Sequence, residues 1–304
     1  LDEVQVSEIQ KQIKKLTELE SRKETILTSI EEQGKLTQEL KSKILGCYDT
    51  NELEDIYLPF KKKKKTRSDT AKENGLEPLA KMIISQRGHD INKIAGGHLN
   101  QNIQTVHDAI QGAKDIIAEW VSEDQEIREK LRQNMRKFAK IQSKVIPKKK
   151  VDAEKYMDYF DFQEQLSRCP SHRYLAILRG VNEEMLKVSL TIDNDRALQM
   201  IDRKYIRSNG QEADIIADAI SDSYKRLIFP SVETQIINEW KENADDEAIR
   251  VFSENLRQLL LAAPLGQKPV LAIDPGFRTG CKVVALDSNG DFLEYTTIFP
   301  HPPQ

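Results

Sequence analysis

The strongest constraint on the fold is a change of pattern at Pro269. Three segments of strand length follow it, at residues 270–273, 281–286 and 292–299. They are rich in apolar and β-branched residues, and the turn before the third contains Asn289-Gly290, a pair that favours tight hairpins. Three strands in a meander cannot bury both faces of a sheet by themselves. We therefore expect a truncated α/β domain whose covering helices lie beyond Gln304.

The rest of the chain has the periodicity of amphipathic helices. In residues 1–45, apolar side chains recur at spacings of three, four and seven, with a break at Gly34. Similar patterns occupy residues 104–120, 123–141, 171–179, 211–228, 231–242 and 244–262. Only residues 186–192 alternate with the period of two that is typical of a half-buried strand. Gly180 follows one helical pattern directly and is expected to end that helix.

These patterns predict a mainly α protein: a multi-helical scaffold with a minor β element and a β-hairpin of a truncated α/β domain at the C-terminus. Pro147 and the lysines that follow it interrupt the helical patterns and predict an internal linker. We predict an N-terminal helical region at residues 1–150, a second helical region with a short strand at 151–265, and the start of the α/β domain at 268–304.

Composition limits the classes of function. Charged residues make up 31% of the chain but the net charge is −3, so a nucleic-acid surface has to be local. The three cysteines are widely spaced, which favours a reducing compartment. No apolar run approaches the roughly 20 residues that span a bilayer. We expect a cytoplasmic protein without a membrane partner, and the absence of an initiator Met at Leu1 suggests a missing upstream segment.

Asp274 is the candidate metal ligand. It ends the first predicted strand and begins the segment Asp274-Pro275-Gly276-Phe277-Arg278-Thr279-Gly280, whose glycines allow a sharp turn. An RNase H-like nuclease uses such an Asp to bind Mg²⁺ or Mn²⁺, an actin-like ATPase uses it to hold phosphate and metal, and a plain hairpin turn also fits. One carboxylate cannot form a two-metal site. We therefore expect no catalytic residue in this chain and no required cofactor, with Mg²⁺ or Mn²⁺ only if an intact site is active.

Basic residues supply the candidate nucleic-acid contacts. The most basic stretch runs from Lys61 to Lys65 and includes Arg67, and each phosphate contact would release counterions. A solvated loop is the alternative interpretation. Arg173 belongs to a smaller cluster with Arg168 and Arg179, in which we favour structural ion pairs for at least one member. The candidate set is Lys61, Lys62, Lys63, Lys64, Lys65, Arg67 and Arg173.

Five blocks of sequence, taken in order, resemble the Tex family of bacterial transcription accessory proteins. They are residues 29–37, 53–61, 170–173, 274–280 and 298–301, so the resemblance covers essentially the whole chain. It implies a helical region with helix-turn-helix character, then a YqgF-type RNase H-like domain with a degenerate active site, helix-hairpin-helix elements and a C-terminal S1 domain. This chain would contain most of the first and the start of the second.

The resemblance implies a non-catalytic scaffold that binds RNA or DNA in transcription. Two alternatives remain open. The intact protein could be a metal-dependent nuclease or resolvase that uses Asp274, or the helices could form a platform that docks RNA polymerase or the ribosome. No small-molecule substrate is expected in any of the three.

Overall fold

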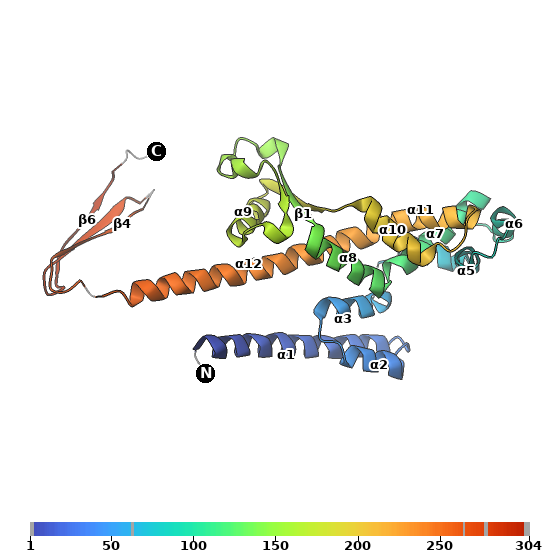
Figure 1. The fold of residues 1–304 in the computed structure, drawn as a ribbon, viewed down its shortest axis with the longest axis horizontal. Helices are drawn as coiled ribbons and strands as arrows, with labels where there is room; N and C mark the ends of the chain where they lie inside the picture. The colour runs from blue at the N-terminus through green and yellow to red at the C-terminus, as the bar shows by residue number, and fades with distance from the viewer. Residues whose placement is uncertain (1–2, 62–63, 264, 277–278, 301–304) are drawn as a thin grey trace. The chain divides into compact units, whose positions relative to one another are not determined.

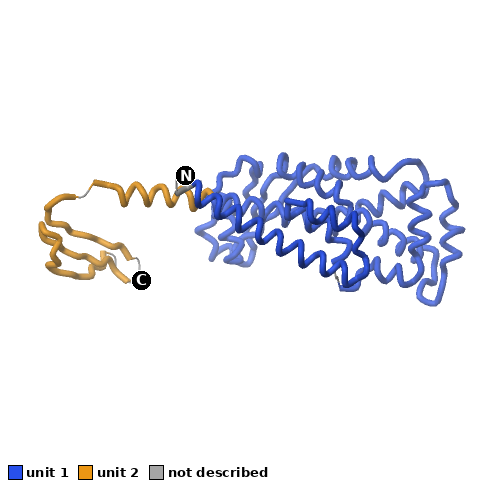
Figure 2. The backbone as a smooth tube through the Cα atoms, turned by 90° about the horizontal axis from the view of Figure 1, so that it is seen from below, with its two compact units in different colours: residues 1–246 blue, residues 247–304 orange. Residues whose placement is uncertain are grey.

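The computed structural model describes residues 3–61, 64–263, 265–276 and 279–300. The chain divides into two compact units, residues 1–246 and 247–304, and the division falls inside the long helix α12, Phe229–Leu260 (Figure 2). Most described residues are helical and the strands form two small antiparallel sheets (Figure 1). The predicted mainly α fold with a minor β element is therefore confirmed. In the described residues, no helix is both long enough and apolar enough to traverse a membrane.

The first helices of unit 1 form a small core of their own. They are α1 (Glu3–Glu31), α2 (Gln38–Leu45), α3 (Thr50–Tyr57) and the 3₁₀ turn η1 (Leu58–Phe60). Helix α2 packs beside α1 (Figure 1), and Ile26, Ile44 and Leu53 are fully buried between the helices. Asp49 begins α3, because its side chain accepts a hydrogen bond from the backbone N–H of Glu52.

A second group of helices surrounds α7. It consists of α4 (Arg67–Glu73), α5 (Glu77–Ser85), α6 (Ile91–Gly96), α7 (Val106–Ser122) and α8 (Gln125–Phe138). Helix α7 contacts α4, α5 and α6, which precede it in the sequence, and α11, which follows it. Its fully buried Ile116 and Ile117 lie in the main hydrophobic core of unit 1. Helix α7 is therefore the central element against which the others pack.

A three-stranded sheet follows α8, with the strand order β2-β1-β3. The elements of this part are β1 (Lys140–Val145), η2 (Pro147–Lys149), η3 (Glu154–Tyr159), β2 (Asp161–Gln165), η4 (Leu166–Arg168), α9 (Ser171–Asn182) and β3 (Leu186–Thr191). The alternating pattern predicted β3 but not the other two strands. The expectation that Gly180 ends a helix is wrong, because α9 continues to Asn182 and Gly180 is buried inside it.

The last elements of unit 1 form one nearly continuous helical stretch after α10 (Asn194–Tyr205). Helix α11 (Gln211–Asp222) leads through a π-helical segment, η5 (Ser223–Ile228), directly into α12. The sequence predicted three separate helices here. Buried Ile216, Ile220 and Val232 hold this stretch against the main core.

The C-terminal strands form a sheet in the order β4-β5-β6, all antiparallel. They are β4 (Val270–Asp274), β5 (Cys281–Leu286) and β6 (Phe292–Ile298). This confirms the predicted three-stranded meander. Gly280, the residue before β5, has a φ of 78°, a conformation that glycine adopts without strain. Leu271 and Ile273 of β4 are exposed.

Candidate functional site

The lysine run lies in the connection between η1 and α4. Lys61, Lys64 and Lys65 are exposed, whereas Lys62 and Lys63 lie outside the described residues. Lys65 forms an ion pair of 2.5 Å with Glu73, and both side chains are well exposed. Exposed pairs of this kind contribute little stability and exchange readily with other partners. The described lysines are therefore accessible to an anionic ligand.

The start of α4 orients the residues that follow the lysines. Thr66 accepts a hydrogen bond from the Asp69 backbone N–H, and the Asp69 carboxylate accepts one from the backbone N–H of Thr66. This capping box fixes the first helical turn. Arg67 is then exposed, while Ser68, the next residue, is buried. The helix thus presents one side chain to solvent and turns its neighbour inward.

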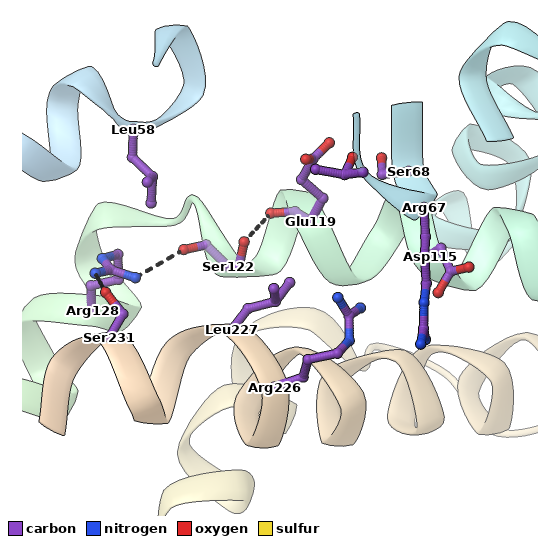
Figure 3. A pocket seen from close by; sticks show the side chains of 11 residues that line it. Leu58, Arg67, Ser68, Asp115, Glu119, Ser122, Arg128, Arg226, Leu227 and Ser231 are labelled. Carbon is purple, nitrogen blue, oxygen red and sulfur yellow. Dashed lines mark hydrogen bonds between the residues drawn. The ribbon is translucent and has the colours of Figure 1, made fainter. Parts of the chain in front are cut away.

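Beside this turn lies a pocket of about 220 Å³, shown in Figure 3. Its walls come from η1, α4, α7, α8, η5 and the first turn of α12, and all of its lining residues belong to unit 1. The lining residues are Leu58, Thr66, Arg67, Ser68, Asp115, Glu119, Ser122, Arg128, Arg226, Leu227 and Ser231. Arg67 and Asp115 lie at one end of the view and Arg128 and Ser231 at the other (Figure 3).

The charges of the pocket are mixed. Burial raises the pKa of Asp115, although the nearby charges of Arg67 and Arg226 act in the opposite direction. Arg226 forms a 2.5 Å ion pair with Asp222, which raises the pKa of its guanidinium. Glu119 forms a 2.6 Å ion pair with Lys72. Asp115 is thus a half-buried carboxylate flanked by two arginines.

The three serines of the pocket differ in their hydrogen bonds. Ser122 donates to the backbone carbonyl of Glu119 over 2.8 Å, and Ser231 Oγ accepts from Arg128 Nη2 over 2.8 Å (Figure 3). Ser68 is only 3% exposed, and its Oγ has no hydrogen-bond partner within the described ranges. A buried hydroxyl without a partner costs about 1–3 kcal/mol. Ser68 therefore carries unused hydrogen-bonding capacity at the wall of the pocket.

The structure places Arg173 on different elements from the lysines. Arg173 lies in the first turn of α9. Its Nη1 donates to Glu164 of β2 at 2.6 Å, and its guanidinium lies 5.7 Å from the centre of the Phe162 ring. Both contacts join α9 to β2. Arg173 is thus engaged in an ion pair and a cation–π contact within the small sheet.

Asp274 is exposed at the end of β4, opposite Lys282 of β5 in the register of the sheet. Among the described residues, no group of three or more His, Cys, Asp or Glu side chains is placed to hold a metal ion. The residues around Asp274 therefore do not fit the several converging carboxylates that a two-metal site requires. No catalytic step follows from Asp274 alone.

The sequence offers the lysines and Arg67 as candidates but gives no sign of the pocket beside them. Ser68 follows Arg67 directly, yet its burial is decided by packing against α7. Asp115 and Arg226 come from helices that are distant in sequence. Neither carries a motif, so only the fold brings them to the lysine segment.

The fold and this site define a helical scaffold protein with a basic segment beside a charged pocket and a β-meander at its C-terminal end. A family model described as Tex central region-like matches residues 86–252, and one described as Tex protein YqgF-like domain matches residues 268–304. The first alone covers more than half of the chain. The chain therefore belongs to the Tex family, as the resemblance implied.

Named relatives are similar over nearly the whole chain. The transcriptional accessory protein Tex of Neisseria gonorrhoeae is 38% identical over an aligned length of 309, an alignment that covers 99% of this chain and 41% of the relative. Protein YhgF of Escherichia coli is 38% identical over 316 residues, with coverages of 100% and 41%. The human S1 RNA-binding domain-containing protein 1 is 26% identical over 319 residues, with coverages of 99% and 32%. The chain thus spans about two fifths or less of the length of these relatives.

Proposed function

We propose that this chain binds RNA or DNA through the phosphate backbone, as the helical part of a transcription accessory protein. The observation that carries the proposal is the exposure of Lys61, Lys64, Lys65 and Arg67 on one short connection between η1 and α4. Cations grouped in this way neutralise phosphates and release the counterions that surround a nucleic acid. The names of the relatives, which refer to transcription and to RNA binding, support the same class of ligand.

The contacts of the segment favour phosphate binding over base recognition. The lysine ammonium groups are compact charges on flexible stems, which attract phosphate without fixing a base sequence. Arg67 can bind a phosphate in a bidentate manner, because its guanidinium presents two parallel donors. Affinity should therefore depend strongly on salt and weakly on sequence.

The salt dependence of binding tests the proposal. Lys61, Lys64 and Lys65 are replaced together by glutamine, and the affinity for a single-stranded RNA is measured by fluorescence anisotropy between 50 and 300 mM salt. Each lost phosphate contact lowers the slope of log affinity against log salt by about 0.7 for a single strand, so the slope should fall by about 2.

Lys148, Lys149 and Lys150 provide a matched control. They form another exposed run of three lysines, next to the small sheet, and their replacement by glutamine removes the same charge. The control variant should keep nearly the whole slope of the unmodified chain. Equal losses of slope in the two variants would show that only net charge matters. The segment from Lys61 to Lys65 would then have no specific part in binding.

A protein-docking role is a second candidate, because the first half of α1 exposes an apolar stripe. Val6, Ile9, Ile13 and Leu16 recur at spacings of three and four and are each 41–58% exposed. Such a face fits a helix that packs against a partner protein. Purified RNA polymerase, treated with nuclease, should bind the chain and lose binding when Ile9 and Ile13 are changed to aspartate. Unchanged binding in that variant would reject the stripe as the docking surface.

A further inference from the structure

We propose that the pocket beside the lysine segment receives one unpaired base of a bound single strand, and that cytosine fits it best. This inference rests on the proposed function, because the lysines must hold the strand before a base can enter. It adds a base-reading step to an interface that otherwise contacts only phosphates. The residues that carry it are Ser68, Asp115, Arg226, Leu58 and Leu227.

The dimensions of the pocket suit a single small ring. Its volume of about 220 Å³ lies below the roughly 300–1,000 Å³ that is usual for sites that take drug-sized molecules. Leu58 from η1 and Leu227 from η5 supply apolar surface, and polar groups surround them (Figure 3). Apolar walls with a few polar groups are what a flat aromatic ring with hydrogen-bonding edges requires.

The charge of the pocket disfavours a phosphate as its occupant. Asp115 lines it and would repel an anion, and Glu119, which also lines it, is already paired with Lys72 at 2.6 Å. Of the three arginines, Arg128 is already held by Asp55 at 2.5 Å and Arg226 by Asp222 at 2.5 Å. A neutral ring that offers donors to the carboxylate avoids this repulsion. The phosphates then stay outside with the lysines.

Hydrogen-bonding groups in the pocket match one edge of cytosine. A carboxylate accepts from the N4 amino group of cytosine, a pairing that recurs in nucleic-acid recognition. Asp115 supplies that carboxylate, and the Ser68 hydroxyl, which has no partner in the described part of the chain, can donate to the ring nitrogen or carbonyl beside it. Thymine and uracil present a carbonyl oxygen in place of the amino group, which the carboxylate would repel. Adenine and guanine also carry an amino donor, but a purine has two fused rings and is larger.

The position of the pocket keeps the free-energy cost of inserting a base low. Thr66, Arg67 and Ser68 line it and follow Lys64 and Lys65 directly in the chain. A strand held on the lysines therefore passes the opening, and its bases are already unpaired, so no duplex has to be broken.

Single-base substitution in a uniform strand tests the inference. The 304-residue chain is titrated with a labelled 12-mer of deoxythymidine and with the same 12-mer carrying one central deoxycytidine. The strand with cytosine should bind about tenfold tighter, because a good polar match at one base contributes about 1.4 kcal/mol. In Asp115→Asn the preference should disappear while the slope of affinity against salt stays the same.

Two further variants keep the result interpretable. Asp218→Asn removes the same charge from an exposed position on α11 outside the pocket and should keep the preference. Ser68→Ala should reduce the preference for the strand that carries cytosine. It serves as the test if urea titration shows that Asp115→Asn is not folded. Equal binding of the two strands by the unmodified chain, with a steep salt slope, would overturn the base pocket and leave phosphate binding intact. Binding to neither strand would overturn both.

Discussion

Arg128 of α8 donates through its Nε to Oδ1 of Asp55 on α3 over 2.5 Å, and both side chains are almost completely buried. Arg132, one helical turn further along α8, reaches Oδ2 of the same carboxylate at 2.6 Å. Helix α3 belongs to the small N-terminal core and α8 to the main core of unit 1. One buried carboxylate thus links two hydrophobic cores through a pair of arginines.

Replacing Asp55 with alanine should strongly destabilise unit 1. The change removes the carboxylate that Arg128 pairs with and leaves Arg132 with Glu129 as its remaining carboxylate partner. Breaking a buried ion pair from one side costs about 3–5 kcal/mol. The free energy of unfolding, measured by urea titration and followed by helical circular dichroism, should fall by that amount.

Glu54→Ala is the matched control for this change. Glu54 is the neighbour of Asp55 on α3 and binds Arg22 at 2.6 Å, but both partners are about one third exposed. Its loss should cost less than about 1 kcal/mol, because solvent screens the pair. Similar losses in the two variants would contradict the role given to burial at Asp55.

The arginines of α8 also show why part of the fold could not be read from the sequence. Arg128, Arg132 and Arg136 bind Ser231, Gln235 and Glu239 of α12 in turn. Both sets have the four-residue spacing of one helix face, so two polar stripes pack together. Periodicity alone assigns a charged helix face to solvent, because the local sequence contains no sign of a complementary polar face about a hundred residues further along.

The strands show the same limit. The alternating pattern of residues 186–192 and the apolar runs after Pro269 predicted β3 and the β4–β6 meander correctly. Strand β1 is not predicted, because the helical pattern of residues 123–141 takes in its first two residues and only Ile141 and Ser143 of the strand are buried. Its strand conformation depends on pairing with β2 and β3 on either side. Tertiary pairing here decides what local preference leaves open.

The site was predictable only in its contiguous part. Lysine runs are visible in any sequence, and Arg67 stands next to them. Asp115 and Arg226, by contrast, come close to Arg67 only because α4 and η5 both pack against α7. Their separate positions in amphipathic helices give no indication of a shared pocket.

Gly180→Ala should destabilise the small sheet in spite of alanine's preference for helices. A Cβ added at Gly180 would lie 2.6 Å from Leu186 Cδ1 and 3.3 Å from Tyr156 Cδ1, where α9 packs closely on β3. Overpacking of this kind costs about 1–3 kcal/mol, whereas the gain in helix propensity is about 1 kcal/mol. Gly96→Ala in α6 meets no atom within 4 Å and should be neutral or slightly stabilising. Thermal unfolding of both variants decides the matter, and a Gly180→Ala protein as stable as the parent would refute the close packing.

Asp115→Asn should change how stability depends on pH. Burial raises the pKa of Asp115 above its usual value of 3.8 in the folded state, so the folded protein holds this proton more tightly than the unfolded chain. The contribution of protonated Asp115 to the free energy of unfolding is therefore present at acid pH. It is lost as the pH rises through the raised pKa of Asp115. The variant should therefore gain stability relative to the parent as the pH rises above 3.8, and should keep that advantage at neutral pH.

Glu77→Gln should change the pH dependence of stability in the opposite direction to Asp115→Asn. The hydrogen bond and charge of Lys81 lower the pKa of Glu77, so its contribution is present at neutral pH and lost as the solution becomes acid. This variant should lose stability relative to the parent at pH 7, by a small amount because the pair is exposed, and match it in acid. Urea midpoints across the pH range measure both differences, and a shared sign would contradict the assignment.

Gly280→Ala should loosen the β5–β6 pairing. Gly290→Ala is the control that separates backbone strain from steric collision of the new Cβ. Both glycines have positive φ, 78° and 88°, so alanine strains the backbone at each. Only at Gly280 would the new Cβ also meet other atoms, at 2.7 Å from Phe299 Cε1 and 2.8 Å from Thr297 Cγ2, whereas nothing lies within 4 Å of it at Gly290. Hydrogen exchange of the amides in β5 and β6 should therefore be faster in Gly280→Ala than in Gly290→Ala. Equal rates in the two variants would mean that backbone conformation alone sets the requirement for glycine, and that the approach of β6 to the turn after Asp274 is not close.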